Sequence, residues 1–114
     1  MSDRICETCC ARRGLAPLHR KRCRLTLRWG LERPSLRGTT GDLSVLGMFV
    51  ATRHPAEPGS AVQIEIEMAG TRARLDAVVM WIRRAPQGRL RRGMGLRLVH
   101  PPPAYADFVT ALPA

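Results

Sequence analysis

The stretch AVQIEIEM, Ala61–Met68, decides the fold class of this 114-residue chain. Apolar and polar residues alternate through it without a break, which gives an extended strand one dry face and one wet face. The pair Ala69-Gly70 comes next and is typical of a tight hairpin turn, and Arg72–Arg84 then alternates again. The centre of the chain is therefore predicted to be an antiparallel hairpin.

Further strands are expected on both sides of this hairpin. Leu25, Leu27 and Trp29 alternate with polar residues, and Pro34 and Gly38 then mark a turn region. The other predicted strands are 37–43, 48–52 and 93–99. Short strands at regular spacing, with turns between them, favour a small closed antiparallel sheet.

The end of the chain departs from this pattern. His100–Pro103 cannot continue a sheet, because its prolines lack the donor that a ladder needs. Ala104–Leu112 has apolar residues at helical spacing, and this short helix is expected to lie against the barrel or across its end. The predicted fold is mainly β, a six-stranded antiparallel barrel with a short C-terminal helix. Trp81 is expected to pack in its core, and stacking on a ligand is the alternative role for it.

Composition and charge restrict the class of protein. The hydrophobic content of 45% and charged content of 25% are ordinary for a single globular domain. The net charge of +10 is unusual, and nearly all of the basic residues are arginine. Such a surface attracts nucleotides, nucleic acid or anionic lipid, although a GC-rich genome would also raise the arginine content.

The N-terminal segment 1–18 shows no sustained apolar period, so it is predicted to be a flexible arm preceding a domain at 19–114. Asp3, Arg4 and Glu7 stand where a secretion signal would need apolar residues, and no apolar run is long enough to span a membrane. A cytoplasmic location is therefore expected. In that compartment the four cysteines would be free thiols or metal ligands rather than disulfides.

Two short motifs carry the candidate chemistry. The first is RKRCR, with Arg20 and Arg24 at its ends, and the second is DLSVLG, with Asp42, Ser44 and Gly47. Guanidinium groups can grip phosphate or stack on a base, a carboxylate can accept from a guanine edge, and a glycine permits close backbone approach. Together the motifs suit a purine nucleotide. The alternatives are a solvated basic linker and plain turn chemistry.

These motifs, in this order, resemble the PilZ domain, a bacterial receptor for cyclic di-GMP. The family pattern is Arg-x-x-x-Arg followed by Asp or Asn-x-Ser-x-x-Gly. The likeness continues through Gly59–Val62, Val78–Trp81 and Gly93–Leu98, and spans about 19–112. His19 stands where many members have another arginine, and Leu98 replaces a usual phenylalanine.

The resemblance implies that cyclic di-GMP binds on the outside of the barrel. Arg20 and Arg24 would hold phosphate and guanine, Asp42 would accept from guanine N1 and N2, and Ser44 would donate to phosphate or assist the base. Gly47 would leave room for the ligand. The neighbouring Lys21 and Arg22 would add auxiliary charge.

The implied function is that of a receptor that changes conformation when it binds the messenger. It would relay this signal to a protein partner in motility, exopolysaccharide production or development. Two alternatives remain open, namely a PilZ-like adaptor that binds protein but no nucleotide, and a nonspecific basic nucleic-acid binder. Under the main hypothesis no DNA or RNA partner is expected.

No catalytic constellation or phosphate loop is present in the sequence, so the protein is not expected to be an enzyme or to need a cofactor. A zinc ion remains an alternative use of the cysteines. Cys6 and Cys9, followed by His19 and Cys23, have spacing that zinc could use, but a single CxxC pair is weak support. Free thiols are the preferred interpretation.

Overall fold

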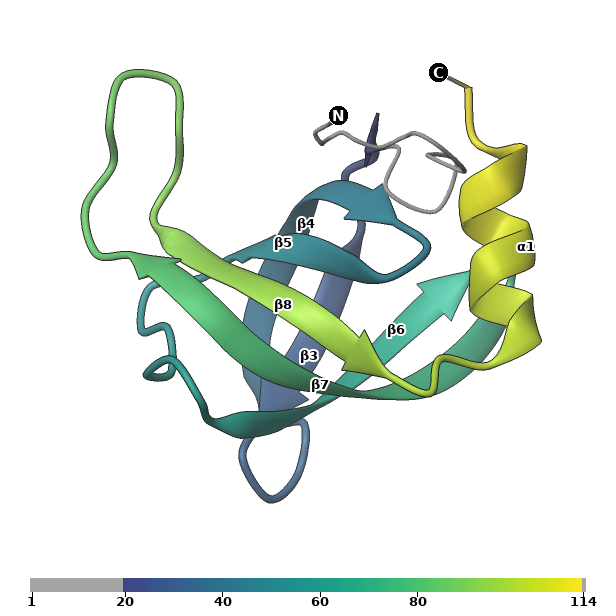
Figure 1. Cartoon of the computed structure of the whole chain (residues 1–114), viewed down its shortest axis with the longest axis horizontal. Coiled ribbons are helices and arrows are strands. Elements are labelled where there is room, and N and C mark those ends of the chain that lie inside the picture. The colour runs from purple at the N-terminus through teal and green to yellow at the C-terminus, as the bar shows by residue number, and fades with distance from the viewer. Residues whose placement is uncertain (1–19, 114) are drawn as a thin grey trace, which may run out of the picture.

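The computed structural model describes residues 20–113, and these form a closed β-barrel with one helix (Figure 1). The elements in chain order are β2 (Lys21–Arg22), β3 (Thr26–Gly30), β4 (Leu36–Ser44), β5 (Gly47–Ala51), β6 (Ala61–Met68), β7 (Thr71–Arg83), β8 (Gly93–Val99) and α1 (Pro103–Ala111). The predicted fold class is confirmed. The predicted strand Ala61–Met68 has these same bounds in the structure.

All neighbouring strands are antiparallel, in the order β2-β4-β3-β6-β7-β8-β5. An additional pairing between β4 and β5 closes strands β3 to β8 into a six-stranded barrel. The two-residue strand β2 lies outside this ring and pairs with the end of β4. Strand β4 therefore holds β5 along one edge, and β3 and then β2 along the other.

The inward-facing apolar residues of the alternating strands fill the interior of the barrel, as the sequence predicted. The inward residues of the central hairpin, Ile64, Ile66, Leu75 and Ala77, are buried, and Trp29 fills the space beside them. Between the hairpin strands, Ala69 and Gly70 have φ values of 51° and 81°, the left-handed conformation that a two-residue turn requires. The hairpin prediction is confirmed down to its turn.

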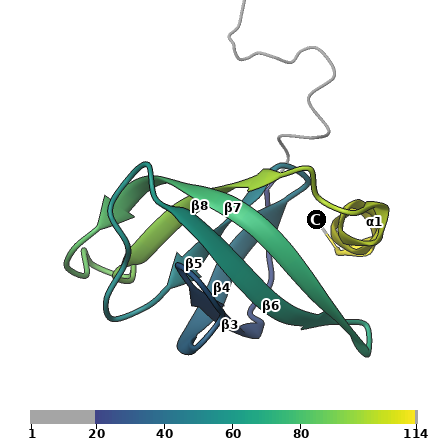
Figure 2. The same ribbon diagram turned by 90° about the horizontal axis from the view of Figure 1, so that it is seen from below.

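The helix α1 lies at one end of the barrel, and the loop between β7 and β8 lies at the opposite end (Figures 1 and 2). Tyr105 and Val109 of α1 are buried, and Phe108 and Leu112 pack partly against the same core. This is the predicted apolar face. No helix in the part of the chain that the structure describes has the length and apolar character needed to cross a membrane.

Two sequence-based expectations need correction. Asp42–Gly47 was expected to be a turn, but β4 runs through Ser44 and β5 begins at Gly47, so only two residues connect them. Trp81 was expected in the core, but it is 42% exposed. A bulge between Val79 and Trp81 shifts the register of β7 against β8, which reverses the alternation and turns the indole outward.

Candidate functional site

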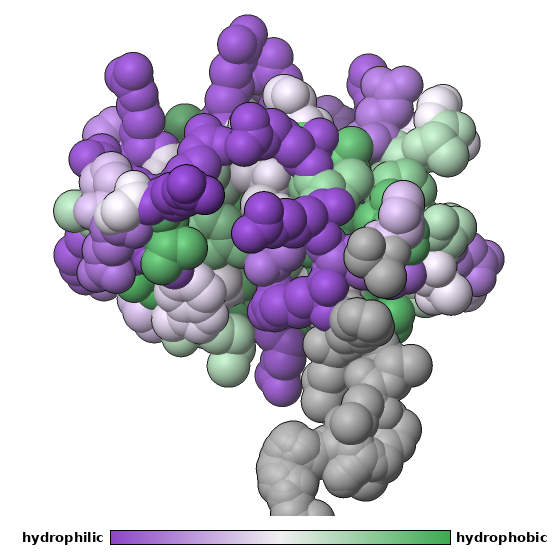
Figure 3. Space-filling view, turned by 90° about the horizontal axis from the view of Figure 1, so that it is seen from above, coloured by the Kyte–Doolittle hydropathy of each residue, from purple (hydrophilic) through white to green (hydrophobic). Residues whose placement is uncertain are grey.

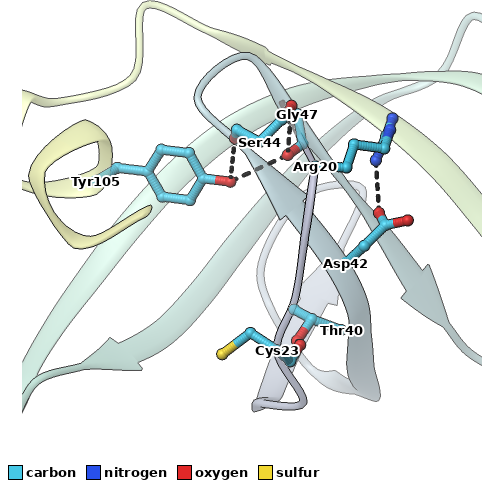
Figure 4. A network of polar contacts seen from close by, with 7 residues as sticks. All are labelled: Arg20, Cys23, Thr40, Asp42, Ser44, Gly47 and Tyr105. Carbon is cyan, nitrogen blue, oxygen red and sulfur yellow. Dashed lines mark hydrogen bonds and ion pairs between the residues drawn. The ribbon is translucent and has the colours of Figure 1, made fainter. Parts of the chain in front are cut away.

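The pairing of β2 with β4 brings the two motifs together. Lys21 lies opposite Leu43 and Arg22 lies opposite Asp42. The guanidinium of Arg20 reaches the Asp42 carboxylate, with 2.5 Å between Nη1 and Oδ1 (Figure 4). The two side chains are 48% and 35% exposed, so this ion pair lies at the surface. The structure thus joins residues that are 22 positions apart in the sequence.

Thr40 fixes the chain on both sides of Arg24. Its buried hydroxyl donates to the carbonyl of Cys23 and accepts from the amide of Leu25, while its own amide donates to the Leu25 carbonyl. The Arg24 side chain itself is exposed, on the short segment between β2 and β3. Sequence analysis missed Thr40. The feature that could have indicated its role is a hydroxyl group at an inward position of a predicted strand.

Tyr105 of α1 supports the β4–β5 turn. Its buried hydroxyl lies 2.8 Å from the Ser44 carbonyl and 3.1 Å from the Gly47 carbonyl, and donates to them (Figure 4). Burial raises the pKa of this phenol well above its usual value, with smaller effects from the nearby charges of Arg20 and Asp42. The hydroxyl therefore stays protonated as a donor at any physiological pH.

The other two residues of the second motif have local partners. Ser44 is only 5% exposed, and its hydroxyl is 3.4 Å from the Gly47 carbonyl. A Cβ at Gly47 would lie 2.3 Å from the carbonyl oxygen of Leu96, so glycine is required for β5 to approach β8. These contacts give both residues a structural reason to be present. Their predicted contacts with ligand stay predictions.

Lys21, the single lysine of the chain, binds the C-terminal end of α1. Its Nζ donates to the carbonyls of Thr110 and Leu112, at 2.9 and 2.8 Å. These carbonyls belong to the last turn of α1, where orphan acceptors and the helix dipole favour a cation. The basic motif is therefore attached directly to the C-terminal end of the helix.

Beside Asp42 the outer surface of the barrel carries an aromatic pair. Phe49 lies opposite Asp42 on β5, Gly95 lies opposite Phe49 on β8, and Trp81 lies opposite Gly95 on β7. The Phe49 and Trp81 rings are stacked, with centroids 5.5 Å apart, and the Arg83 guanidinium lies 5.1 and 5.2 Å from their centres. A Cβ at Gly95 would collide with the indole.

These contacts form a continuous row on the outer face of the barrel. It runs from Arg22 through Asp42, Phe49 and Gly95 to Trp81, one residue from each of five neighbouring strands. Basic, acidic and aromatic groups therefore lie side by side on one surface. Sequence analysis considered ligand stacking for Trp81 only as the less favoured alternative and did not identify Phe49 as its partner. The sequence feature that could have indicated the pair is the Gly-x-Gly of β8, because Gly95 has no side chain and leaves room for an outward-facing ring.

Comparison with known proteins identifies the family. The PilZ domain family model matches residues 18–111, most of the chain. The chain belongs to the PilZ family. The fold is similar to the crystal structure of the PilZ domain of CeSA from a cellulose-synthesizing bacterium, with a TM-score of 0.58 and 22% sequence identity, over 81% of this chain and 91% of that one. A search among curated proteins found no significant match.

PilZ domains are binding domains rather than enzymes, and the row described above is typical of a binding surface. The zinc alternative falls mostly outside the described residues, since Cys6, Cys9 and His19 all precede residue 20. Cys23 is a half-buried free thiol. Within residues 20–113 no group of three or more His, Cys, Asp or Glu side chains could hold a metal ion.

Proposed function

We propose that this PilZ domain is a receptor for cyclic di-GMP and binds it on the outer face of the barrel, around Arg20, Arg24 and Asp42. The observation that carries the proposal is the contact between Arg20 and Asp42, because it places both halves of the family motif at one point. The ligand offers two phosphates to the arginines and guanine donors to the carboxylate.

The ion pair can open for a ligand at low cost. Both partners are partly exposed, and surface ion pairs contribute less than about 1 kcal/mol to stability. A ligand that gives Arg20 a phosphate and Asp42 a guanine edge replaces one contact with two. The stacked Phe49 and Trp81 rings next to Asp42 add a surface on which a base can lie.

The signal would leave through α1. Lys21 lies between the two motif arginines and holds the end of α1, while Tyr105 of α1 holds the residues on either side of the β4–β5 turn. A ligand that moves the basic segment or the turn changes the contacts of the helix. A helix with two such contacts is a suitable element to present to a protein partner in motility, exopolysaccharide production or development.

Calorimetric titration of the purified protein with cyclic di-GMP tests the proposal. Arg24→Ala and Asp42→Asn should each weaken binding by roughly 10-fold to 100-fold, the range for a lost charge-assisted hydrogen bond. Arg33→Ala is the matched control, because Arg33 is an exposed arginine in the β3–β4 loop that forms no ion pair within residues 20–113. It should bind as the unaltered protein does.

The same titration separates the rival functions. An adaptor that binds only protein would give no heat with the dinucleotide. A nonspecific nucleic-acid binder would show no preference for cyclic di-GMP over a DNA oligonucleotide, and its DNA affinity would fall steeply with salt. Either result, or equal losses in Arg24→Ala and Arg33→Ala, would rule out the proposed site.

A further inference from the structure

A groove with a volume of about 740 Å³ lies at the other end of β4, away from the messenger site. Its walls come from the first half of β4, the segment that follows β5, and the β7–β8 loop. On β4 the groove lining extends from Leu36 to Thr39, and Thr39 is three positions from Asp42, which is about 10 Å along an extended strand. The groove and the messenger site are therefore neighbours that share no residue.

Backbone and side-chain hydrogen bonds build the walls of this groove. The amide of Thr52 donates to the Arg92 carbonyl, which joins the β7–β8 loop to the end of β5. The Thr52 hydroxyl accepts from the indole of Trp29 at 3.2 Å and donates to the Arg37 carbonyl at 3.3 Å. The Arg83 guanidinium donates to the Arg91 carbonyl from the opposite side. The groove is a formed feature of the fold.

Its charge is one-sided. The lining includes five arginines and no acidic residue; the arginines are Arg37, Arg53, Arg89, Arg91 and Arg92. The high arginine content of the chain does not by itself explain why this groove has no acidic residue. A smaller groove on the β3–β6 side is lined by Arg28, Arg37 and Arg72 together with Glu65 and Glu67. Within residues 20–113, no ion pair involves any of the five arginines.

Apolar side chains lie among these charges. Leu36 and Leu90 are 46% and 53% exposed, and Pro86 and Ala51 complete the apolar part of the lining. Hydrophilic side chains cover much of the face in Figure 3, with hydrophobic residues between them. A partner for this groove must supply both negative charge and apolar side chains.

We infer that this groove binds an acidic segment of a partner protein that also carries leucine-like side chains. Its carboxylates would meet the arginines, and its apolar side chains would cover Leu36 and Leu90. No Phe, Tyr or Trp side chain lines the groove, and His54 is its single ring, so it offers little of the aromatic surface on which single-stranded nucleic acid stacks. The groove would thus dock a protein at a surface that contains none of the messenger-site residues.

Fluorescence anisotropy with defined peptides tests this inference. The probe is a labelled 12-residue peptide of alternating leucine and glutamate, and the two control peptides replace either glutamate by glutamine or leucine by serine. At physiological salt, the probe should bind at least tenfold more tightly than either control. A labelled oligonucleotide of 12 thymidines should bind more weakly than the probe.

Charge reversal then locates the binding. Arg53→Glu and Arg89→Glu should each weaken probe binding at least tenfold, and Arg33→Glu, a matched reversal outside the groove, should change it less than twofold. Arg24→Glu at the messenger site should also leave the probe bound. All these positions are exposed, and circular dichroism checks that each variant is folded.

The leucines provide a second, uncharged test. Leu90→Gln should weaken probe binding severalfold, whereas Leu31→Gln should not, although Leu31 is similarly exposed at 59%. Equal effects of groove and control variants would overturn the inference, as would tighter binding of the oligonucleotide. Because neither Arg53 nor Arg89 belongs to the messenger site, failure here leaves the cyclic di-GMP proposal untouched.

Discussion

The two ends of β4 differ in whether the arginines there have an acidic partner within the protein. At the C-terminal end, Arg20 is paired with Asp42, and the surrounding backbone is held by Thr40, Tyr105 and Lys21. At the N-terminal end, arginines from three segments line a groove that contains no carboxylate. Where the protein supplies a carboxylate, as Asp42 does for Arg20, the arginine has a counter-charge until a ligand competes for it. A basic groove without such a carboxylate depends on an outside partner for its counter-charge.

The largest expected effect contrasts the glycines at these ends. Gly47→Ala would place a Cβ 2.3 Å from the Leu96 carbonyl oxygen, which belongs to a barrel strand and cannot give way. Gly38→Ala at the groove end would meet side-chain atoms, the nearest being 2.7 Å away on Val50. We expect Gly47→Ala to lower the free energy of unfolding by roughly 3 kcal/mol or more, and Gly38→Ala by less. Urea denaturation measures both.

Equal losses in the two glycine variants would contradict this contrast. They would mean that the side chains of the core near Val50 are as rigid as the β8 backbone. A loss in Gly38→Ala alone would mean that the β5–β8 contact can relax, and Gly47 would then be present for its ligand rather than for packing.

The second prediction concerns the phenol that supports the messenger end. Tyr105→Phe removes the donor to the Ser44 and Gly47 carbonyls and should lower the free energy of unfolding by about 2 kcal/mol. Thermal unfolding measures this loss. Thr52→Val, which removes a hydroxyl that serves the groove end, is the comparison, and it should cost less because Thr52 is only partly buried.

The same phenol predicts a pH dependence. An unfolded tyrosine ionises near pH 10, whereas burial raises the pKa of Tyr105 in the folded state. The resulting stability is complete below pH 10 and is lost as the pH rises towards the higher folded pKa, because only the unfolded chain releases the proton. Tyr105 is the single tyrosine, so phenolate absorbance reports it alone. Half-ionisation at pH 10 in folded protein would show that the phenol is not buried.

The strands could be predicted from sequence because each has one buried face. Alternation in Ala61–Met68 and in the segment around Trp29 determines which side chains face the core, and pairing follows from the short turns between strands. The sequence predicted that Arg20 and Asp42 serve one ligand, but their direct contact was not predicted, since no local pattern shows that strand β2 pairs with β4.

The outward position of Trp81 could not be predicted in the same way. A single bulge after Val79 reverses the alternation, and its position depends on how β7 pairs with β8 rather than on the sequence of β7. The groove was also missed, because its five arginines come from three segments that only the closed barrel brings together. Local patterns identify the strands, whereas surface sites depend on which strands become neighbours.

A smaller effect is expected where the basic motif meets the helix. Lys21→Met keeps the aliphatic stem but removes both hydrogen bonds to the end of α1, and should cost about 1 kcal/mol. Hydrogen exchange should show faster opening of α1 with little change in β6 and β7. Arg22→Met is the matched control, because Arg22 is exposed and points to the opposite face of β2. Unchanged exchange in α1 would show that the helix is held without Lys21.

The smallest effect on stability is expected for Arg20→Ala, although this variant should lose much of its cyclic di-GMP affinity. The ion pair with Asp42 is partly exposed on both sides, so its removal should change the free energy of unfolding by less than about 1 kcal/mol. Urea denaturation in low and high salt gives the test, because an exposed pair is screened by salt and the two proteins should converge as salt rises. A large loss of stability that persists in high salt would mean that the pair supports the fold. The acid at this end of β4 would then be a structural partner of Arg20, and the contrast with the acid-free groove would carry no information about ligands.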